Sequence, residues 1–353
     1  NVLFTLAPVV QTAIAIIGAA TLLIAGFSAL TQHDLKRVLA YSTISQIGYM
    51  FLALGVGAWS AAIFHFMIHA FFKALLFLGA GSVILLLDEE HDMFKMGGLR
   101  KKLPVIFITF LIAGASLSAL PLITAGFYSK DQILWLSWSS GMGSKWLWLA
   151  GITGAFITSL YTFRMIFLTF FGELKIQPKH KPGLLMTIPL IILAILSLLG
   201  GFIELPENLG PVRLFSKLLT PLLPSINLNN IVTPEWLFQI ISAIISIGGI
   251  YLAYIFFYKN SAFSVSFGKS RLSNFFYSGW RFDRLYDTLF VRPFVWLSEI
   301  NKKDFIDKFY SYIAMATSFL NMLLSRTQNG KLRWYVTVLA AGIVVLLTIM
   351  LTL

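Results

Sequence analysis

The sequence contains no cysteine and few charged residues. Without Cys the chain can form no disulfide, and no thiolate can bind a metal or an iron–sulfur cluster. Only 12% of the residues are charged, whereas soluble domains carry about 25%. Hydrophobic residues make up 58% of the chain, and the mean hydropathy is +0.81. This composition excludes an ordinary soluble domain and predicts an all-α polytopic membrane protein.

Apolar stretches long enough to cross a bilayer recur along the whole chain. We expect eight spans, at residues 7–30, 38–57, 61–87, 104–138, 146–171, 184–203, 236–258 and 334–353. The first is no signal peptide, because no basic segment precedes it and its apolar run is too long. Since the chain opens on Asn1 rather than Met, and nearly inside a helix, we expect it to be the C-terminal part of a longer protein.

The basic residues indicate a topology rather than an acidic ligand. The chain has 27 Lys and Arg against 15 Asp and Glu, and the basic residues gather in alternate connections between the spans. One side carries Lys36, Arg37, Lys95, Arg100, Lys101, Lys102, Lys175, Lys179, Lys181, Lys259, Lys269 and Arg271, and the other carries Lys145, Arg213 and Lys217. By the positive-inside rule the first side is cytoplasmic, or the matrix side in an organelle. Nucleic-acid binding explains the excess less well, because these residues are spread over loops without a recognition motif.

Three titratable residues recur every four positions inside the span 61–87. His65, His69 and Lys73 share one helix face, because four residues advance a helix by slightly more than one turn. A lysine near the middle of a bilayer costs roughly 2.5–3.5 kcal/mol, so it is expected to face a polar interior and to act there. The spacing favours a proton relay. The alternative is a set of hydrogen bonds that only pack helices together.

The stretch 104–138 is too long for one span. As a straight helix it would extend about 52 Å, against a hydrocarbon thickness of about 30 Å. Because proline removes a backbone donor and clashes with the preceding turn, Pro121 predicts a broken helix near 120–126. Broken helices are tolerated at membrane depth only inside protein or beside a wet cavity. Lys130 and Asp131 follow the break, so they belong to an ion site or, alternatively, lie at the water interface beyond a packing kink.

The region 259–333 is patterned too regularly for a loop. From 281 to 325 apolar residues return at helical spacing, with charged residues between them, which predicts a long amphipathic helix on the cytoplasmic side. A break at Pro293 is the alternative to one continuous helix. Such a helix lies on lipid headgroups or on neighbouring subunits, and its few lysines favour protein.

Several segments together resemble a known family. They are 34–49 (DLKRVLAYSTISQIGY), 65–77 (HFMIHAFFKALLF), 95–99 (KMGGL) and 126–131 (GFYSKD). They are similar to the antiporter-like subunits of respiratory complex I, the NADH:quinone oxidoreductase, and the first two are shared with Mrp sodium/proton antiporters. The ending is more specific. Residues 282–287 (FDRLYD) and 330–335 (GKLRWY), with the amphipathic stretch between them, resemble the lateral and anchoring helices of the distal antiporter-like subunit in bacteria.

The resemblance implies a fold of two inverted five-helix repeats, each with one broken helix. Only the second repeat would be present here, at residues 1–171. Two further transmembrane helices would follow within 172–258, then the lateral helix region at 259–333 and a C-terminal transmembrane anchor at 334–353. The first repeat of the family, with its own acid and lysine, has no counterpart in this sequence.

The resemblance also assigns roles to individual residues. It implies that Lys73 is the central lysine, with His65 and His69 as relay groups and Lys130 with Asp131 as the terminal site for proton transfer. Two further pairs of charged residues match the family outside these proton-transfer groups. Asp34 and Lys36 match charged positions near cytoplasmic helix ends, and Asp283 and Asp287 match acids that we expect to hold the lateral helix in place.

The function implied is that of a proton-translocating subunit in a bacterial inner membrane, coupled at a distance to quinone reduction. No cofactor belongs to this chain, since NADH, FMN, iron–sulfur clusters and quinone would be held by partner subunits. The partners implied are the other membrane-arm subunits, especially the adjacent antiporter-like ones, and lipid. Two alternatives remain open: the corresponding subunit of an Mrp-type sodium/proton antiporter, and a mainly structural brace whose polar track carries no net flux.

Overall fold

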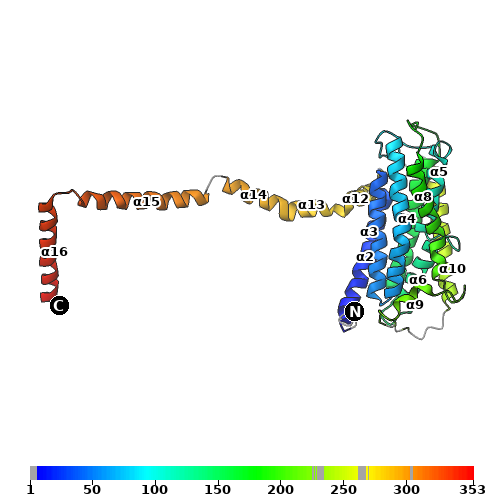
Figure 1. Ribbon diagram of the computed structural model, residues 1–353, viewed down its shortest axis with the longest axis horizontal. Helices are drawn as coiled ribbons and strands as arrows, with labels where there is room; N and C mark the ends of the chain where they lie inside the picture. Colours follow the sequence, from blue (N-terminus) through cyan, green and yellow to red (C-terminus); the bar gives the residue numbers. More distant parts are fainter. Residues whose placement is uncertain are drawn as a thin grey trace. The chain divides into compact units, whose positions relative to one another are not determined.

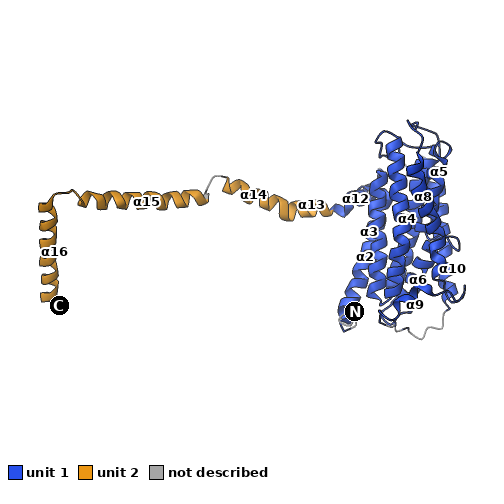
Figure 2. Cartoon of the chain, viewed as in Figure 1, with its two compact units in different colours: residues 1–281 blue, residues 282–353 orange. Residues whose placement is uncertain are grey.

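A computed structural model describes residues 6–224, 226, 228, 234–260, 268, 270–302 and 305–353, with helices throughout. Contacts divide the chain into two compact units, residues 1–281 and 282–353, each described by itself (Figure 2). Among the described residues, seven helices are long and apolar enough to cross a membrane. The prediction of an all-α polytopic membrane protein is therefore confirmed.

Six of these helices form the first unit (Figure 1). They are α2 (Pro8–Thr31), α3 (Leu35–Gly55), α4 (Trp59–Leu86), α7 (Lys145–Phe170), α8 (Leu184–Leu199) and α10 (Glu235–Ala253). A 3-10 turn, Gly200–Ile203, extends α8, and a π-helical turn, Tyr254–Lys259, extends α10. The observed bounds agree with the predicted spans to within a few residues, because the apolar runs that define a span also set its helix length. Short α9 (Leu214–Leu219) lies in the connection before α10.

The stretch 104–138 is broken, as its length and Pro121 predict. It forms α5 (Pro104–Leu117) and α6 (Ala125–Ser139), joined by residues 118–124. Ala119 and Leu122 in this connection adopt left-handed backbone angles, with φ of 56° and 65°. The break thus begins slightly before the predicted position, since a chain that cannot continue through Pro121 leaves the helix in the preceding turn.

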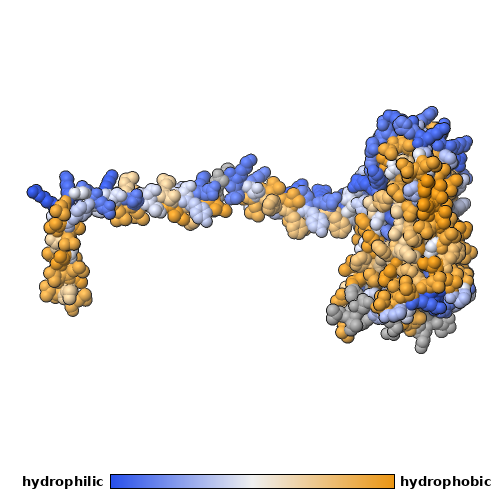
Figure 3. All heavy atoms as spheres, viewed as in Figure 1, coloured by the Kyte–Doolittle hydropathy of each residue, from blue (hydrophilic) through white to orange (hydrophobic). Residues whose placement is uncertain are grey.

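Hydrophobic residues cover the sides of the helical bundle, and hydrophilic residues gather mainly near its ends (Figure 3). Inside, the core includes Phe64 and Phe72 of α4, Phe110 of α5 and Phe170 of α7, all fully buried. A helical bundle with apolar sides and a packed interior suits a protein whose sides contact lipid.

The last helix of the first unit, α12 (Arg271–Tyr277), packs on α2. Phe276 stacks on Phe27 with ring centroids 5.0 Å apart, and Trp280 donates a hydrogen bond from Nε1 to the Ile24 carbonyl at 3.1 Å. Trp280 adopts a left-handed φ of 59°, which turns the chain after α12. These contacts hold α12 and Trp280 against α2.

The second unit consists of α13 (Phe282–Tyr286), α14 (Arg292–Asn301), α15 (Phe305–Thr327) and α16 (Leu332–Thr352), with a π-helical turn at Asp287–Val291. The alternative of a break at Pro293 is wrong, because the π-helical turn carries the helix up to it. The Arg292 amide donates to the Asp287 carbonyl, five residues back, in a wider turn that accommodates the missing proline donor. A single continuous helix over 281–325 is also wrong, since α14 ends at Asn301.

Some predicted features fall on residues that the structure does not describe. Within the predicted lateral region these are 261–267, Lys269, Lys303 and Asp304, and at the start of the predicted repeat they are residues 1–5.

Candidate functional site

The predicted titratable face of α4 is buried inside the first unit. His65, His69 and Lys73 are 0%, 7% and 5% exposed. The imidazole rings of His65 and His69 lie 6.3 Å apart between centroids. The three side chains therefore face protein rather than lipid, as the cost of a charged group in hydrocarbon requires.

Lys73 meets polar groups from two neighbouring helices. Its ammonium group donates a hydrogen bond to the Ser42 hydroxyl of α3. The Tyr161 hydroxyl of α7 lies beside Ser42 and Gln46 without a hydrogen bond of normal geometry to either. Ser42, Gln46 and Tyr161 are all fully buried. Sequence reasoning missed these residues, and their one signal is the pair of polar residues four positions apart in the apolar span 38–57.

The broken helix supplies a second buried cation. Lys130 of α6 is 1% exposed, and its Nζ donates to the carbonyl of Leu117 at 2.8 Å. Leu117 ends α5, so its carbonyl has no partner within the helix, and the helix dipole there attracts a positive charge. The ammonium also lies 5.1 Å from the ring centroid of Tyr49. Breaking one helix into two thus creates the acceptor that holds this lysine.

Asp131 follows Lys130 in sequence but occupies a different environment. It is 1% exposed, and neither of its carboxylate oxygens has a hydrogen-bond partner among the described residues. It faces Ser242 of α10, with Glu235 of the same helix close enough to act on it electrostatically. The alternative that Lys130 and Asp131 lie at the water interface is therefore wrong, because both are buried.

One hydrogen bond joins the two predicted groups of residues. His65 Nδ1 of α4 lies 3.0 Å from Ser129 Oγ of α6, next to Lys130 in sequence. The five predicted residues His65, His69, Lys73, Lys130 and Asp131, which we call the polar track, are all buried on α4 and α6, and this contact links the two helices.

Several polar atoms along the polar track lack partners in the described part of the chain. They include Nε2 of His65, Nε2 of His69, the carboxylate of Asp131 and both side-chain polar atoms of Gln46. Buried polar groups are nearly always hydrogen-bonded, to protein or to ordered water. These atoms are therefore buried polar groups that the described residues leave without a hydrogen bond of normal geometry.

The remaining predicted residues lie outside the polar track. Asp34 caps the N-terminus of α3 by accepting hydrogen bonds from the amides of Lys36 at 2.7 Å and Arg37 at 3.1 Å. The Lys36 side chain is exposed. In the second unit Asp287 accepts a hydrogen bond from Nε of Arg292 at 2.8 Å, and Asp283 is exposed.

A buried arginine lies at the end of the bundle that carries the basic loops. Arg164 of α7 donates to the Gln32 carbonyl at 2.8 Å and lies near the rings of Phe94 and Phe257. Next to it, burial and the positive charge of Arg164 lower the pKa of His33 below its ordinary value, while Asp92 opposes the shift. In the described part of the chain, His, Asp and Glu form no group of three that could hold a metal ion.

Comparison with known proteins finds sequences that are similar to this chain. The family model described as "NADH:quinone oxidoreductase/Mrp antiporter, TM" matches residues 1–158. NADH-quinone oxidoreductase subunit L of Pseudomonas aeruginosa is 46% identical over 349 residues, which cover 98% of this chain and 55% of that protein. The same subunit of Escherichia coli K12 is 45% identical over 355 residues, which cover 99% of this chain and 56% of that protein. The chain thus spans about half the length of these relatives.

A solved structure supports the fold alone. The structure of the Mrp complex from Dietzia sp. DQ12-45-1b contains a chain that matches with a TM-score of 0.52 and 19% identity, over 95% of this chain and 33% of that one. At this identity the likeness shows a shared helical architecture and carries no further argument about chemistry.

Proposed function

Because this chain is homologous along nearly its whole length to subunit L of NADH-quinone oxidoreductase, we propose that it is a proton-translocating part of such an enzyme. The observation that carries the proposal is the polar track, in which α4 and α6, joined by the contact between His65 and Ser129, bury five titratable side chains. A membrane protein retains such groups at a cost, and a proton path is the function that needs them.

The positions of the side chains support an order for the groups of the proposed relay. Lys73 lies at one end, beside Ser42, and the two histidines follow along α4. His65 reaches α6 through Ser129, and Lys130 and Asp131 form the other end. Imidazole can accept a proton at one nitrogen and release one from the other, so histidine suits the middle of a relay. Water at the unsatisfied atoms fills the intervals.

Electrostatic repulsion supplies the driving step. Positive charges a few ångströms apart repel strongly in a low-dielectric interior, so neighbouring groups of the polar track are not all protonated at once. A proton that arrives on one group therefore favours release from the next. A change in charge at one end of the track thus moves a proton at the other.

Redox chemistry belongs elsewhere in the proposed complex. NADH, FMN, iron–sulfur clusters and quinone would be bound by partner subunits, and neighbouring antiporter-like subunits would contact this one. We place the protein in a bacterial inner membrane with its basic loops on the cytoplasmic side. Residues 1–171 would act as the antiporter-like repeat, 259–333 as a lateral helix held by Asp283 and Asp287, and 334–353 as the anchor.

Replacing Lys73 by Ala tests this function. The change removes one proton-carrying group and leaves the apolar contacts of α4 in place, so the enzyme should assemble and oxidise NADH while pumping fewer protons. Proton uptake into vesicles would be measured against NADH oxidation, with Lys101→Ala, an exposed lysine, as the matched control. Full pumping by Lys73→Ala would remove this residue from the mechanism.

An Mrp-type antiporter is the second candidate, because the matching family model covers both classes. It predicts proton movement driven by a sodium gradient without NADH. The same vesicles distinguish the two candidates: a sodium pulse in the absence of NADH should move protons only in the antiporter.

A further inference from the structure

A row of polar residues follows one face of α10. Glu235, Gln239, Ser242 and Ser246 recur at intervals of four, three and four residues, which places them on one side of the helix. Gln239, Ser242 and Ser246 are buried. We call these four residues the polar stripe. The other faces of α10 are apolar and exposed, as at Ile240 and Ile244, so the stripe faces the bundle, where α10 packs on α6 and α7.

The middle of the polar stripe meets the end of the polar track. Ser242 lies close enough to Asp131 to act on its carboxylate, but its hydroxyl and both oxygens of Asp131 make no hydrogen bond of normal geometry with the described residues. Both residues are at least nine-tenths buried. A carboxyl and a hydroxyl that lie this close without a well-formed hydrogen bond are suited to binding a water molecule, because an unpaired buried polar group is costly.

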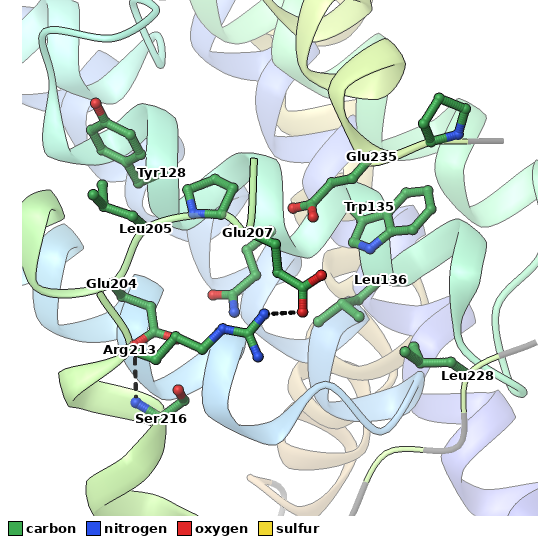
Figure 4. A pocket seen from close by; sticks show the side chains of 13 residues that line it. Tyr128, Trp135, Leu136, Glu204, Leu205, Glu207, Arg213, Ser216, Leu228 and Glu235 are labelled. Atoms are coloured by element: carbon green, nitrogen blue, oxygen red, sulfur yellow. Dashed lines mark hydrogen bonds and ion pairs between the residues drawn. The ribbon is translucent and has the colours of Figure 1, made fainter. Parts of the chain in front are cut away.

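The outer end of the polar stripe opens into a pocket of about 450 Å³ (Figure 4). We call it the α10 pocket. Its polar lining residues are Gln132, Glu204, Glu207, Arg213, Ser216 and Glu235. A water molecule needs about 30 Å³ in the liquid, so the pocket has room for roughly ten or more. Gln132, the residue after Asp131, also lines the pocket, and its buried Oε1 has no hydrogen-bond partner among the described residues.

The carboxylates of the α10 pocket have different partners. Glu207 forms an ion pair with Arg213, and Glu204 accepts a hydrogen bond from the Ser216 amide at 3.1 Å. Glu235 points into the pocket and makes no ion pair with the described residues (Figure 4). Among the described residues its one hydrogen bond is long, 3.5 Å from Nε2 of Gln239. Glu235 is therefore the acid of this pocket best able to take up and release a proton.

We propose that the polar stripe and the α10 pocket form the arm that connects Asp131 with water at this end of the bundle, and that Glu235 is its outermost proton acceptor. Protonated Asp131 gives its proton to water held at Ser242, and the water passes a proton to the Glu235 carboxylate. Asp131 is left as the carboxylate and Glu235 as the acid, which then releases its proton to water in the pocket. This arm deepens the proposed function and rests on it.

Cysteine accessibility tests whether water reaches position 242, and it does so without measuring pumping. These 353 residues contain no Cys, so Ser242→Cys introduces a thiol whose labelled peptide is unique among them. The probe is a membrane-impermeant trimethylammonium methanethiosulfonate, added to the assembled complex in membranes and scored by peptide mass spectrometry. Ile244→Cys is the matched control, because that residue lies two positions away and is 63% exposed on the apolar side of the helix. Since a charged reagent is excluded from hydrocarbon, Ser242→Cys should react roughly a hundredfold faster.

Proton transfer through the arm is tested at Glu235. Glu235→Gln keeps the size of the side chain but cannot carry a proton, so the ratio of protons pumped to NADH oxidised should fall. Glu235→Asp should restore it, which a merely structural hydrogen bond from Gln239 does not predict. Glu173→Gln, an exposed acid far along the chain, is the control.

Two results would overturn the proposal. One is a Ser242→Cys thiol that reacts no faster than the Ile244→Cys thiol, and the other is full pumping by assembled Glu235→Gln. Failure of the proposed function looks different: Lys73→Ala and Glu235→Gln would then both leave proton movement unchanged, while the labelling result would still report whether water reaches Ser242.

Discussion

Lys130 shows how a single residue can be charged at membrane depth. Its ammonium contacts the carbonyl that ends α5, where the helix dipole and an orphan acceptor both stabilise a cation. Asp131 is one position further round the helix and points to α10 instead. Because the two neighbours face different partners, they do not neutralise each other in a fixed ion pair. A proton can therefore change the state of one without locking the other.

His33 predicts a pH dependence at the other end of the bundle. Its ring lies 4.9 Å from that of Phe94 and 5.2 Å from that of Tyr277, between centroids. Burial first, and then Arg164, lower its pKa in the folded protein below 6.5. The unfolded chain therefore binds the proton more tightly, so the stability that neutral His33 contributes is present above about pH 6.5 and lost as the pH falls.

Thermal unfolding in detergent across this pH range measures the effect. The His33→Phe variant should lose less stability on acidification than the parent protein, because it has no proton to take up at this position. His180→Phe, at an exposed position, should follow the parent. Equal slopes for the His33 variant and the parent would show that His33 does not contribute to the acid sensitivity.

The broken helix depends on one close approach between its halves. The Gly126 amide donates to Ser116 Oγ at 3.1 Å, and a Cβ at Gly126 would lie 1.8 Å from the Ser116 carbonyl oxygen. No side chain fits there unless α6 moves away from α5. That movement would also displace Lys130 from the Leu117 carbonyl, so the contact that holds Lys130 depends on a glycine.

Gly126→Ala should therefore destabilise the protein by at least about 1–3 kcal/mol, as overpacking of a well-filled interior does. Gly81→Ala is the matched control, because nothing lies within 4 Å of a Cβ at that helical position. It should leave stability unchanged or raise it by up to about 1 kcal/mol. Thermal unfolding of the purified complex gives both values. Equal melting temperatures for the two variants would contradict the close approach.

The positions of the helices were more predictable from the sequence than the contacts between them. The spans and the break near Pro121 follow from apolar length and proline chemistry, which are local properties. Neither a break at Pro293 nor one continuous helix over 281–325 describes the second unit. A π-helical turn accommodates the missing proline donor, and α14 ends only at Asn301. Ser42 and Ser129 could not be assigned to Lys73 and His65, since no local pattern tells which helices face each other. The polar stripe of α10 has a visible period but only one charge, so it gave a weak signal.

The two units of the molecule differ in how they are stabilised. The first has a buried aromatic and aliphatic core and a set of internal hydrogen bonds. In the second, the described residues of α13, α14 and α16 include none that are buried, and large apolar side chains of α15 such as Phe309 and Ile313 are exposed. An amphipathic helix needs a surface for its apolar face. We propose that the membrane supplies one for α16 and that neighbouring subunits supply one for α15.

The apolar face of α15 should therefore govern assembly rather than proton transfer. Phe309→Asp combined with Ile313→Asp would forfeit about 1.5–3 kcal/mol of burial at each position and add two unpaired acids to an apolar interface. We expect the protein to dissociate from the complex on native gels of detergent-extracted membranes. Ser311→Asp with Ser318→Asp adds the same charge to the polar side of the same helix and should leave the complex intact. Lys73→Ala should also remain assembled and lose only pumping. An intact complex carrying the Phe309 and Ile313 changes would mean that α15 is not held by its apolar face, and the segment would then have to be held by its polar residues or by lipid.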